Sequence, residues 1–140
     1  MEFPVIVLKE KDNMIYYYKK KKDLLKTTEE LALRKKVFDR TTIIDSEGYA
    51  YKVKGITKSG YVGFFGLNPL LKNWWSDREI KIELEFEPNI EKIELSALKQ
   101  IALEKVEKSK RFWSEAWDIE DLKKAINDAI TFESLIGLFR

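Results

Sequence analysis

The segment REIKIELEFEP, residues 78–88, restricts the fold more than any other part of the chain. From position 79 to position 87, every even-numbered residue is apolar and every odd-numbered residue is charged. A period of two is that of a β-strand with one buried and one solvated face, as in an antiparallel sheet that is covered on one side. We therefore expect the four even-numbered side chains to face a layer of helices: Ile80, Ile82, Leu84 and Phe86.

Two β-hairpins are predicted before residue 60. The first joins strands at 3–8 and 14–18, with Asp12 and Asn13 supplying the turn. The second joins strands at 41–44 and 49–54 across a turn that ends at Gly48. Between the hairpins we expect one or two helical turns at 28–33, with Thr27 or Thr28 as the N-cap.

The apolar period becomes helical after residue 94. Ser96 is expected to cap a first helix with an apolar stripe at Leu98, Ile101, Ala102 and Val106. Asp118 and Thr131 are expected to cap two further helices, the last of which ends near Gly137. Each of these two starts carries apolar residues at the spacing of a hydrophobic staple: Trp117 with Leu122, and Ile130 with Leu135.

This order of elements, with strands first and helices last, predicts an α+β fold. N-terminal antiparallel hairpins would form a sheet, and C-terminal helices would pack on one face of it. The chain has 140 residues, no internal repeat and no linker-like segment, so we expect residues 1–140 to form a single domain.

The composition excludes several kinds of chemistry. The chain has no histidine and no cysteine, which rules out Ser-His-Asp and Cys-His catalysis and ordinary zinc sites. Any metal would have to be a hard cation held by oxygen atoms, and we expect neither a metal site nor a cofactor. With no disulfide framework and no apolar run that could span a bilayer, we expect a cytoplasmic protein that does not contact membranes.

Charge is unevenly distributed along the chain. Residues 1–60 hold 14 basic and 9 acidic side chains, a balance of +5, and residues 61–140 hold 12 basic and 15 acidic ones, a balance of −3. The run YYYKKKK at 16–22 favours an alternative function, a nucleic-acid-binding module in the basic N-terminal half. On a strand, however, Tyr17 would point away from Tyr16 and Tyr18. Lysines that protect a solvated strand end explain the run equally well.

Two further patterns suggest small-molecule chemistry. Gly60, Gly63 and Gly66 are spaced like a phosphate loop, but Pro69 stands where that motif requires a helix, so these glycines are interpreted as turn residues. The three glutamates on the charged side of the 79–87 strand, with tryptophans close in sequence, leave open a carboxylate-dependent enzyme as a third alternative: Glu83, Glu85 and Glu87.

The stretch YVGFFGLNPLLKNWW, residues 61–75, is apolar and irregular. It has five aromatic residues, three leucines and one charge. It could pack as a loop on the core or form a surface that another molecule covers. Adjacent Trp74 and Trp75 cannot both point inward from an extended segment, so we expect at least one of them to be accessible as a binding anchor.

A group of acidic residues surrounds the second helix start, close to Phe112, Trp113 and Trp117. Helix capping explains part of this group. Carboxylates among large aromatic side chains are also the composition of a surface that binds a basic protein. We therefore add four residues to the candidate partner-binding site: Glu115, Asp118, Glu120 and Asp121.

In outline the whole chain resembles small bacterial immunity proteins of contact-dependent or polymorphic toxin systems. The likeness rests on hairpins first, the strand REIKIELEFEP, and a closing helical part with SEAWDIEDLKKAINDAITFESLI. The resemblance implies a non-enzymatic cytoplasmic protein that neutralises one cognate toxin by covering its active site. For a nuclease toxin, it implies an acidic covering surface, which points to the half after residue 60.

Overall fold

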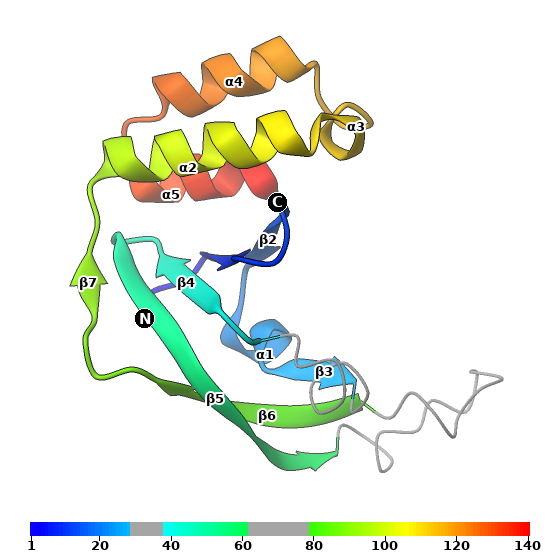
Figure 1. Ribbon diagram of the computed structural model, residues 1–140, viewed down its shortest axis with the longest axis vertical. Helices are drawn as coiled ribbons and strands as arrows, with labels where there is room; N and C mark the ends of the chain where they lie inside the picture. Colours follow the sequence, from blue (N-terminus) through cyan, green and yellow to red (C-terminus); the bar gives the residue numbers. More distant parts are fainter. Residues whose placement is uncertain (29–37, 62–78) are drawn as a thin grey trace, which may run out of the picture.

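The computed structural model describes residues 1–28, 38–61 and 79–140, and they form the α+β fold that the sequence predicts (Figure 1). The described strands are β1 (Val5–Lys9), β2 (Ile15–Tyr18), β3 (Lys26–Thr28), β4 (Thr41–Asp45), β5 (Tyr49–Tyr61), β6 (Glu79–Phe86) and β7 (Glu91–Lys92). The described helices are α1 (Lys21–Leu24), α2 (Leu95–Lys108), α3 (Lys110–Trp113), α4 (Ile119–Asp128) and α5 (Phe132–Ile136), with a 3-10 turn, η2 (Gly137–Phe139), after α5. No helix in these ranges is both long enough and apolar enough to cross a membrane.

The strands form one curled antiparallel sheet in the order β2-β1-β4-β5-β6-β3, with β7 paired to the start of β5. Both predicted hairpins are confirmed, because β1 pairs with β2 and β4 pairs with β5. Strand β5 extends to Tyr61, seven residues beyond its predicted end. Its register with β6 shifts between Val53 and Gly55 and again between Lys58 and Gly60. Such bulges bend a strand and increase its twist, which lets the second half of the sheet curl away from the first.

The sheet has a hydrophobic core on each of its faces. On one face, Ile6, Leu8 and Ile44 pack with buried residues of α2, α4 and α5; we call this the helical core. On the other face, Val5, Val7 and Ile43 pack with buried residues of α1 and β6; we call this the sheet core. Strand β1 supplies alternate residues to both cores, so all four side chains from Val5 to Leu8 are buried.

The alternation in β6 is confirmed, but the prediction that its apolar face meets the helical layer is wrong. Ile80 and Ile82 are fully buried in the sheet core, while Leu84 and Phe86 are only partly buried against it. The cause is the curl of the sheet, which turns this face of β6 toward the concave side, where α1 lies (Figure 1).

Of the three N-caps predicted after residue 94, two are confirmed and one is wrong. Asp118 accepts a hydrogen bond from the Asp121 backbone, and Thr131 forms a capping box with Ser134, so both N-caps are confirmed. Ser96 is not a cap, since α2 begins at Leu95 after Glu94. The staple at Ile130 is also wrong, because that side chain is 86% exposed. In the expected stripe of α2, Ile101 lies at the exposed edge while the other three residues are buried.

The region predicted as a helical turn at 28–33 begins with a strand instead. Thr27 and Thr28 belong to β3, which pairs with β6, and neither caps a helix. Residues 29–33 lie outside the described ranges. A short helix that the sequence analysis did not predict, α1, precedes β3. Its last residue, Leu24, is buried in the sheet core, which fixes α1 against the sheet.

The turn between β4 and β5 is organised by a buried carboxylate. Asp45 is 1% exposed and accepts hydrogen bonds from the backbone nitrogens of Glu2, Glu47 and Tyr49 and from the Tyr51 hydroxyl, at 3.0–3.2 Å. Burial, followed by the nearby negative charge of Asp45, raises the pKa of Tyr51, which therefore stays a protonated donor. The carboxylate thus connects the N-terminal segment to the β4–β5 hairpin.

Candidate functional site

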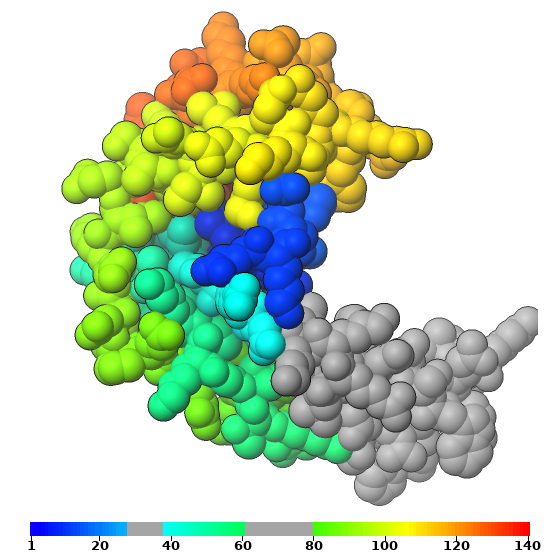
Figure 2. Space-filling view, in the orientation of Figure 1, coloured from blue at the N-terminus to red at the C-terminus, as the bar shows by residue number. Residues whose placement is uncertain are grey.

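The four predicted acidic residues after residue 110 lie together at one corner of the helical layer. Glu115 is in the turn after α3, Asp118 caps α4, and Glu120 and Asp121 occupy the first turn of α4. All four side chains are exposed. We call this set the acidic corner. It lies at the end of the molecule formed by α2, α3 and α4, whose yellow and orange side chains cover the top of Figure 2.

Aromatic residues fix the backbone of the acidic corner. Trp113 is buried in the helical core, and its ring packs edge-on against Phe139 with centroids 5.4 Å apart. The Trp117 backbone nitrogen donates to the Trp113 carbonyl at 2.9 Å, which closes the turn that carries Glu115. A buried tryptophan thus anchors a turn whose next three residues, Ser114 to Ala116, are exposed.

Two aromatic side chains remain accessible at the corner. Phe112 is 52% exposed although its ring contacts Trp113, and Trp117 is half-buried against the helical core. The turn from Ser114 to Glu120 borders a shallow hollow of about 600 Å³. Accessible aromatic rings beside a hollow that carries carboxylates form the kind of surface on which binding energy concentrates in protein complexes.

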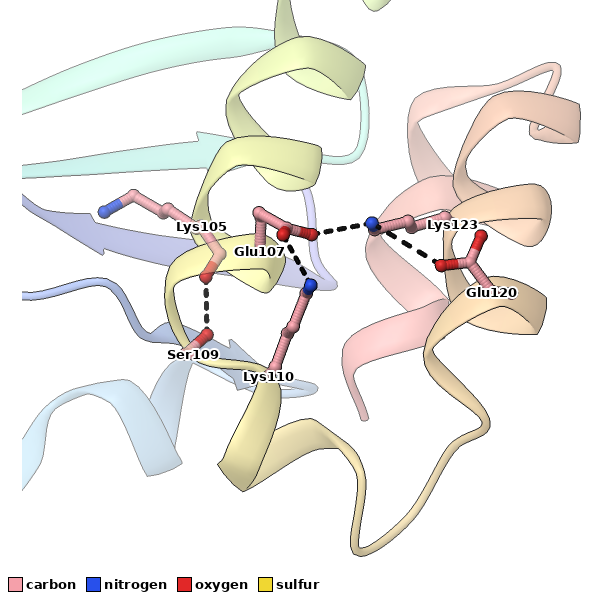
Figure 3. Close-up of polar contacts among 6 residues, drawn as sticks. All are labelled: Lys105, Glu107, Ser109, Lys110, Glu120 and Lys123. Carbon is pink, nitrogen blue, oxygen red and sulfur yellow. Dashed lines mark hydrogen bonds and ion pairs between the residues drawn. The ribbon is translucent and has the colours of Figure 1, made fainter.

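A chain of ion pairs connects the acidic corner to α2 and α3 (Figure 3). Glu107 of α2 contacts the Nζ of Lys110 at 2.5 Å and that of Lys123 at 2.6 Å, and Lys123 lies 3.7 Å from Glu120. Hydrogen bonds from Lys110 and then Lys123 lower the pKa of Glu107, and Glu107 in turn raises the pKa of Lys123. Sequence analysis did not predict this chain, although Glu107 with Lys110 and Glu120 with Lys123 each have the i,i+3 spacing of helical ion pairs.

These contacts distinguish the four carboxylates. The side chain of Asp118 is occupied by its cap, and Glu120 is within reach of Lys123 but remains 84% exposed on its side chain. Within the described parts of the chain, Glu115 forms neither an ion pair nor a side-chain hydrogen bond. The side chain of Asp121 likewise has no such contact with a described residue, because only its backbone nitrogen takes part in the cap. Glu115 and Asp121 are therefore the two carboxylates of the corner that are best able to meet a partner.

The other candidate residues lie partly outside the residues that the structure describes. Trp74 and Trp75 lie outside the described residues, as do Gly63 and Gly66, so the proposed anchor and the glycine pattern remain predictions. Gly60 lies in β5. On β6, Glu83 and Glu85 are exposed, as alternation predicts, and Glu87 follows the strand in an exposed position. Within the described ranges, no three acidic side chains are grouped closely enough to hold a metal ion.

The lysine run lies away from the acidic corner. Lys19 to Lys22 are all exposed after β2 and in α1. Tyr16 and Tyr18 pack on the sheet core, whereas Tyr17 packs on the helical core. As the period of a strand requires, the three tyrosines therefore do not form a common stacking platform.

Comparison with models of protein families finds no match for this chain, and neither do comparisons with curated proteins and with solved structures.

Proposed function

We propose that this chain is a non-enzymatic protein-binding domain that presents the acidic corner to a basic partner. The observation that carries the proposal is one hollow lined by Trp117 and by Glu115, an exposed carboxylate with no partner among the described residues, close in sequence to the exposed ring of Phe112. Long-range attraction between the carboxylates and a basic surface would speed encounter, and aromatic contact would then slow dissociation.

The particular partner that we propose is the active-site surface of a cognate bacterial toxin, with this chain as the cytoplasmic immunity protein. The resemblance of the whole chain in outline supports this role. An acidic surface on a rigid helical layer also suits an enzyme whose active site is basic because it binds nucleic acid. Trp74 or Trp75 would contribute a second anchor.

The test uses the product of the toxin gene that should lie next to the gene for this chain. Co-expression should prevent the growth arrest caused by the toxin domain, and the two purified proteins should form a complex. Glu115→Lys should reduce the association rate, with a loss that shrinks at higher salt. Glu87→Lys is the matched control, because Glu87 is an exposed carboxylate beyond β6 and far from α4 along the sheet.

Two results would contradict the proposal. One is a toxin-like neighbour that this chain neither binds nor inhibits. The other is an equal effect of both charge reversals on association, which would mean that only net charge matters. Glu120→Lys is less informative, because it would place two lysines together at Lys123.

A nucleic-acid-binding module is the alternative, and one observation favours it. Six exposed lysines on the side of α1, β3 and β6 form no ion pair with any described residue: Lys19, Lys20, Lys21, Lys22, Lys26 and Lys81. The test is binding of a labelled oligonucleotide. Affinity that falls steeply between low and moderate salt, and that is lost when these lysines are replaced, would establish this alternative in place of the first proposal.

A further inference from the structure

A second hollow lies at the opposite end of the molecule from the acidic corner. Its volume is about 490 Å³, within the range of about 300–1,000 Å³ that is typical of small-molecule sites. We call it the N-terminal pocket. Six apolar and two charged residues line it: Met1, Phe3, Leu24, Leu25, Leu84, Phe86, Lys21 and Glu83.

The walls of this pocket are held by backbone contacts. The Ile82 nitrogen donates to the Leu25 carbonyl at 2.9 Å, which ties the end of α1 to β6. The Ser46 nitrogen donates to the Glu2 carbonyl at 3.1 Å, which ties the N-terminal segment to the β4–β5 turn. The N-terminal segment and the end of α1, which together supply five of the lining residues, Lys21 included, are thus each hydrogen-bonded to the sheet.

The apolar lining is incompletely covered by the residues that the structure describes. Along β6, burial falls from Ile80 and Ile82, which are at most 2% exposed, to the half-buried Leu84 and Phe86 at the pocket. Met1 is 38% exposed. Covering such side chains with an apolar ligand removes their surface from water and is favourable at roughly 25 cal/mol per Å².

The charges around the pocket favour an anion. Lys21 lines the pocket and forms no ion pair with a described residue, although Glu83 lines it too. Three further exposed lysines lie on α1, β3 and β6, namely Lys22, Lys26 and Lys81, and Lys19 and Lys20 directly precede α1. Lys26 stands directly opposite Lys81 in the sheet. Five exposed carboxylates lie on or next to the same segments: Glu2, Asp23, Glu83, Glu85 and Glu87. Six lysines against five carboxylates leave a balance of +1 among these exposed side chains.

We propose that the N-terminal pocket binds a small amphiphilic carboxylate, with the apolar body against Leu24, Leu84 and Phe86 and the carboxylate paired with Lys21. This site is separate from the acidic corner and does not depend on the function proposed above. The apolar wall supplies most of the affinity, because an ion pair at an exposed lysine contributes little. The role of Lys21 is instead to favour a negatively charged headgroup over a positively charged one.

The test is calorimetric titration of the protein with decanoate, below its micelle concentration, compared with decyltrimethylammonium. Decanoate should bind with a single site and the cation at least about tenfold more weakly. Lys21→Gln should weaken decanoate binding about two- to fivefold, the value of an exposed ion pair. Lys22→Gln is the matched control, since Lys22 is its exposed neighbour in α1 but does not line the pocket. Glu83→Gln should strengthen binding, whereas Glu85→Gln should have a smaller effect.

Methyl NMR of the unaltered protein locates the site without any substitution. Decanoate should shift the methyl signals of Leu24, Leu25 and Leu84 and leave those of Leu122 and Leu135, deep in the helical core, unchanged. The proposal is overturned if decanoate does not bind, if the cation binds as tightly, or if the helical-core methyls shift instead. Binding to anionic phospholipid vesicles without binding to decanoate would overturn it as well, because the surface would then recognise a membrane.

Discussion

At the scale of single residues, the β4–β5 turn restricts strictly which residue can stand at position 48. Gly48 has φ of +89°, and its nitrogen donates to the Asp45 carbonyl at 3.0 Å. A Cβ atom at this position would lie 2.5 Å from the ring of Phe132, the first residue of α5. The turn therefore requires glycine at position 48 for two reasons: its backbone has a positive φ, and α5 approaches it closely.

We expect Gly48→Ala to lower the free energy of unfolding by about 1–3 kcal/mol from backbone strain alone, with an additional loss from the displaced Phe132 ring. Urea denaturation measures this. Gly137→Ala is the control, because Gly137 has a negative φ of −61° and no atom within 4 Å of an added Cβ. The control should change stability by no more than about 1 kcal/mol. Equal losses in the two variants would mean that the turn geometry is wrong.

At the scale of elements, α4 illustrates how one residue can serve both fold and surface. Asp118 belongs to the acidic corner, yet its carboxylate accepts from the Asp121 nitrogen at 3.1 Å and caps the helix. We expect Asp118→Ala to reduce stability by about 0.5–2 kcal/mol, as for other N-cap losses, and Asp118→Ser to restore most of it. Thermal unfolding followed by circular dichroism would compare them. If serine does not rescue stability, the loss arises from charge and the capping role is secondary.

Strand β6 gives a second prediction at this scale. Ile82→Ala should cost about 2–5 kcal/mol because Ile82 is 2% exposed in the sheet core. Phe86 is half-buried at the N-terminal pocket, so Phe86→Ala should cost less than the roughly 3 kcal/mol that marks the lower limit for a fully buried phenylalanine. Chemical denaturation of both variants tests the gradient of burial along the strand. A larger loss for Phe86 than for Ile82 would contradict it.

Local patterns in the sequence predicted part of the local structure, although the cap at Ser96, the staple at Ile130 and the cap at Thr27 or Thr28 were wrong. The alternation in β6, the turn at Gly48 and the caps at Asp118 and Thr131 all depend on interactions within a few residues, and all are confirmed. What lies opposite each face depends on the curl of the sheet, which arises from bulges in β5 at Gly55 and Gly60. Glycine inside a strand indicates a bulge, but the strand was predicted to end at residue 54, before both glycines. For this reason the partner of the β6 apolar face was predicted wrongly.

Some features of the candidate site could likewise be predicted from the sequence, and others could not. The proximity of Glu115, Asp118, Glu120 and Asp121 follows from their closeness in sequence, so it could be predicted. The burial of Trp113 against Phe139 and the exposure of Phe112 could not be predicted, because both depend on where η2 packs. The N-terminal pocket brings together residues 1–3, 21–25 and 83–86, and no short-range pattern connects them.

At the scale of the whole molecule, the acidic corner and the six lysines that pair with no described residue lie apart. The acidic corner lies at the end formed by α3 and α4, and the unpaired lysines lie on α1, β3 and β6 at the other end (Figure 1). This separation agrees with the charge balances of the two halves of the chain, and it would orient the molecule in the field of a charged partner before contact.

We expect the combined change of Lys20, Lys21 and Lys22 to glutamine to alter stability by less than about 0.5 kcal/mol, since all three are exposed and unpaired among the described residues. Lys105→Gln is the contrasting variant. Its Nζ donates to the carbonyls of Lys9 and Asp12 at 3.1 and 2.9 Å, which ties α2 to the first hairpin, and burial lowers its pKa. Losing these bonds should cost about 1–3 kcal/mol in a urea titration. A costly triple change would show that the lysines have structural partners.

Strand β1 supplies Val5 and Val7 to one core and Ile6 and Leu8 to the other. We therefore expect neither core to lose its order while the other keeps its own, so that the two layers unfold as one cooperative unit. Hydrogen exchange should detect this as a common opening free energy for the amides of β1, β4 and α2, equal to that of global unfolding. Two distinct opening free energies, one for the helical layer and one for the strands, would instead show that the two layers unfold separately.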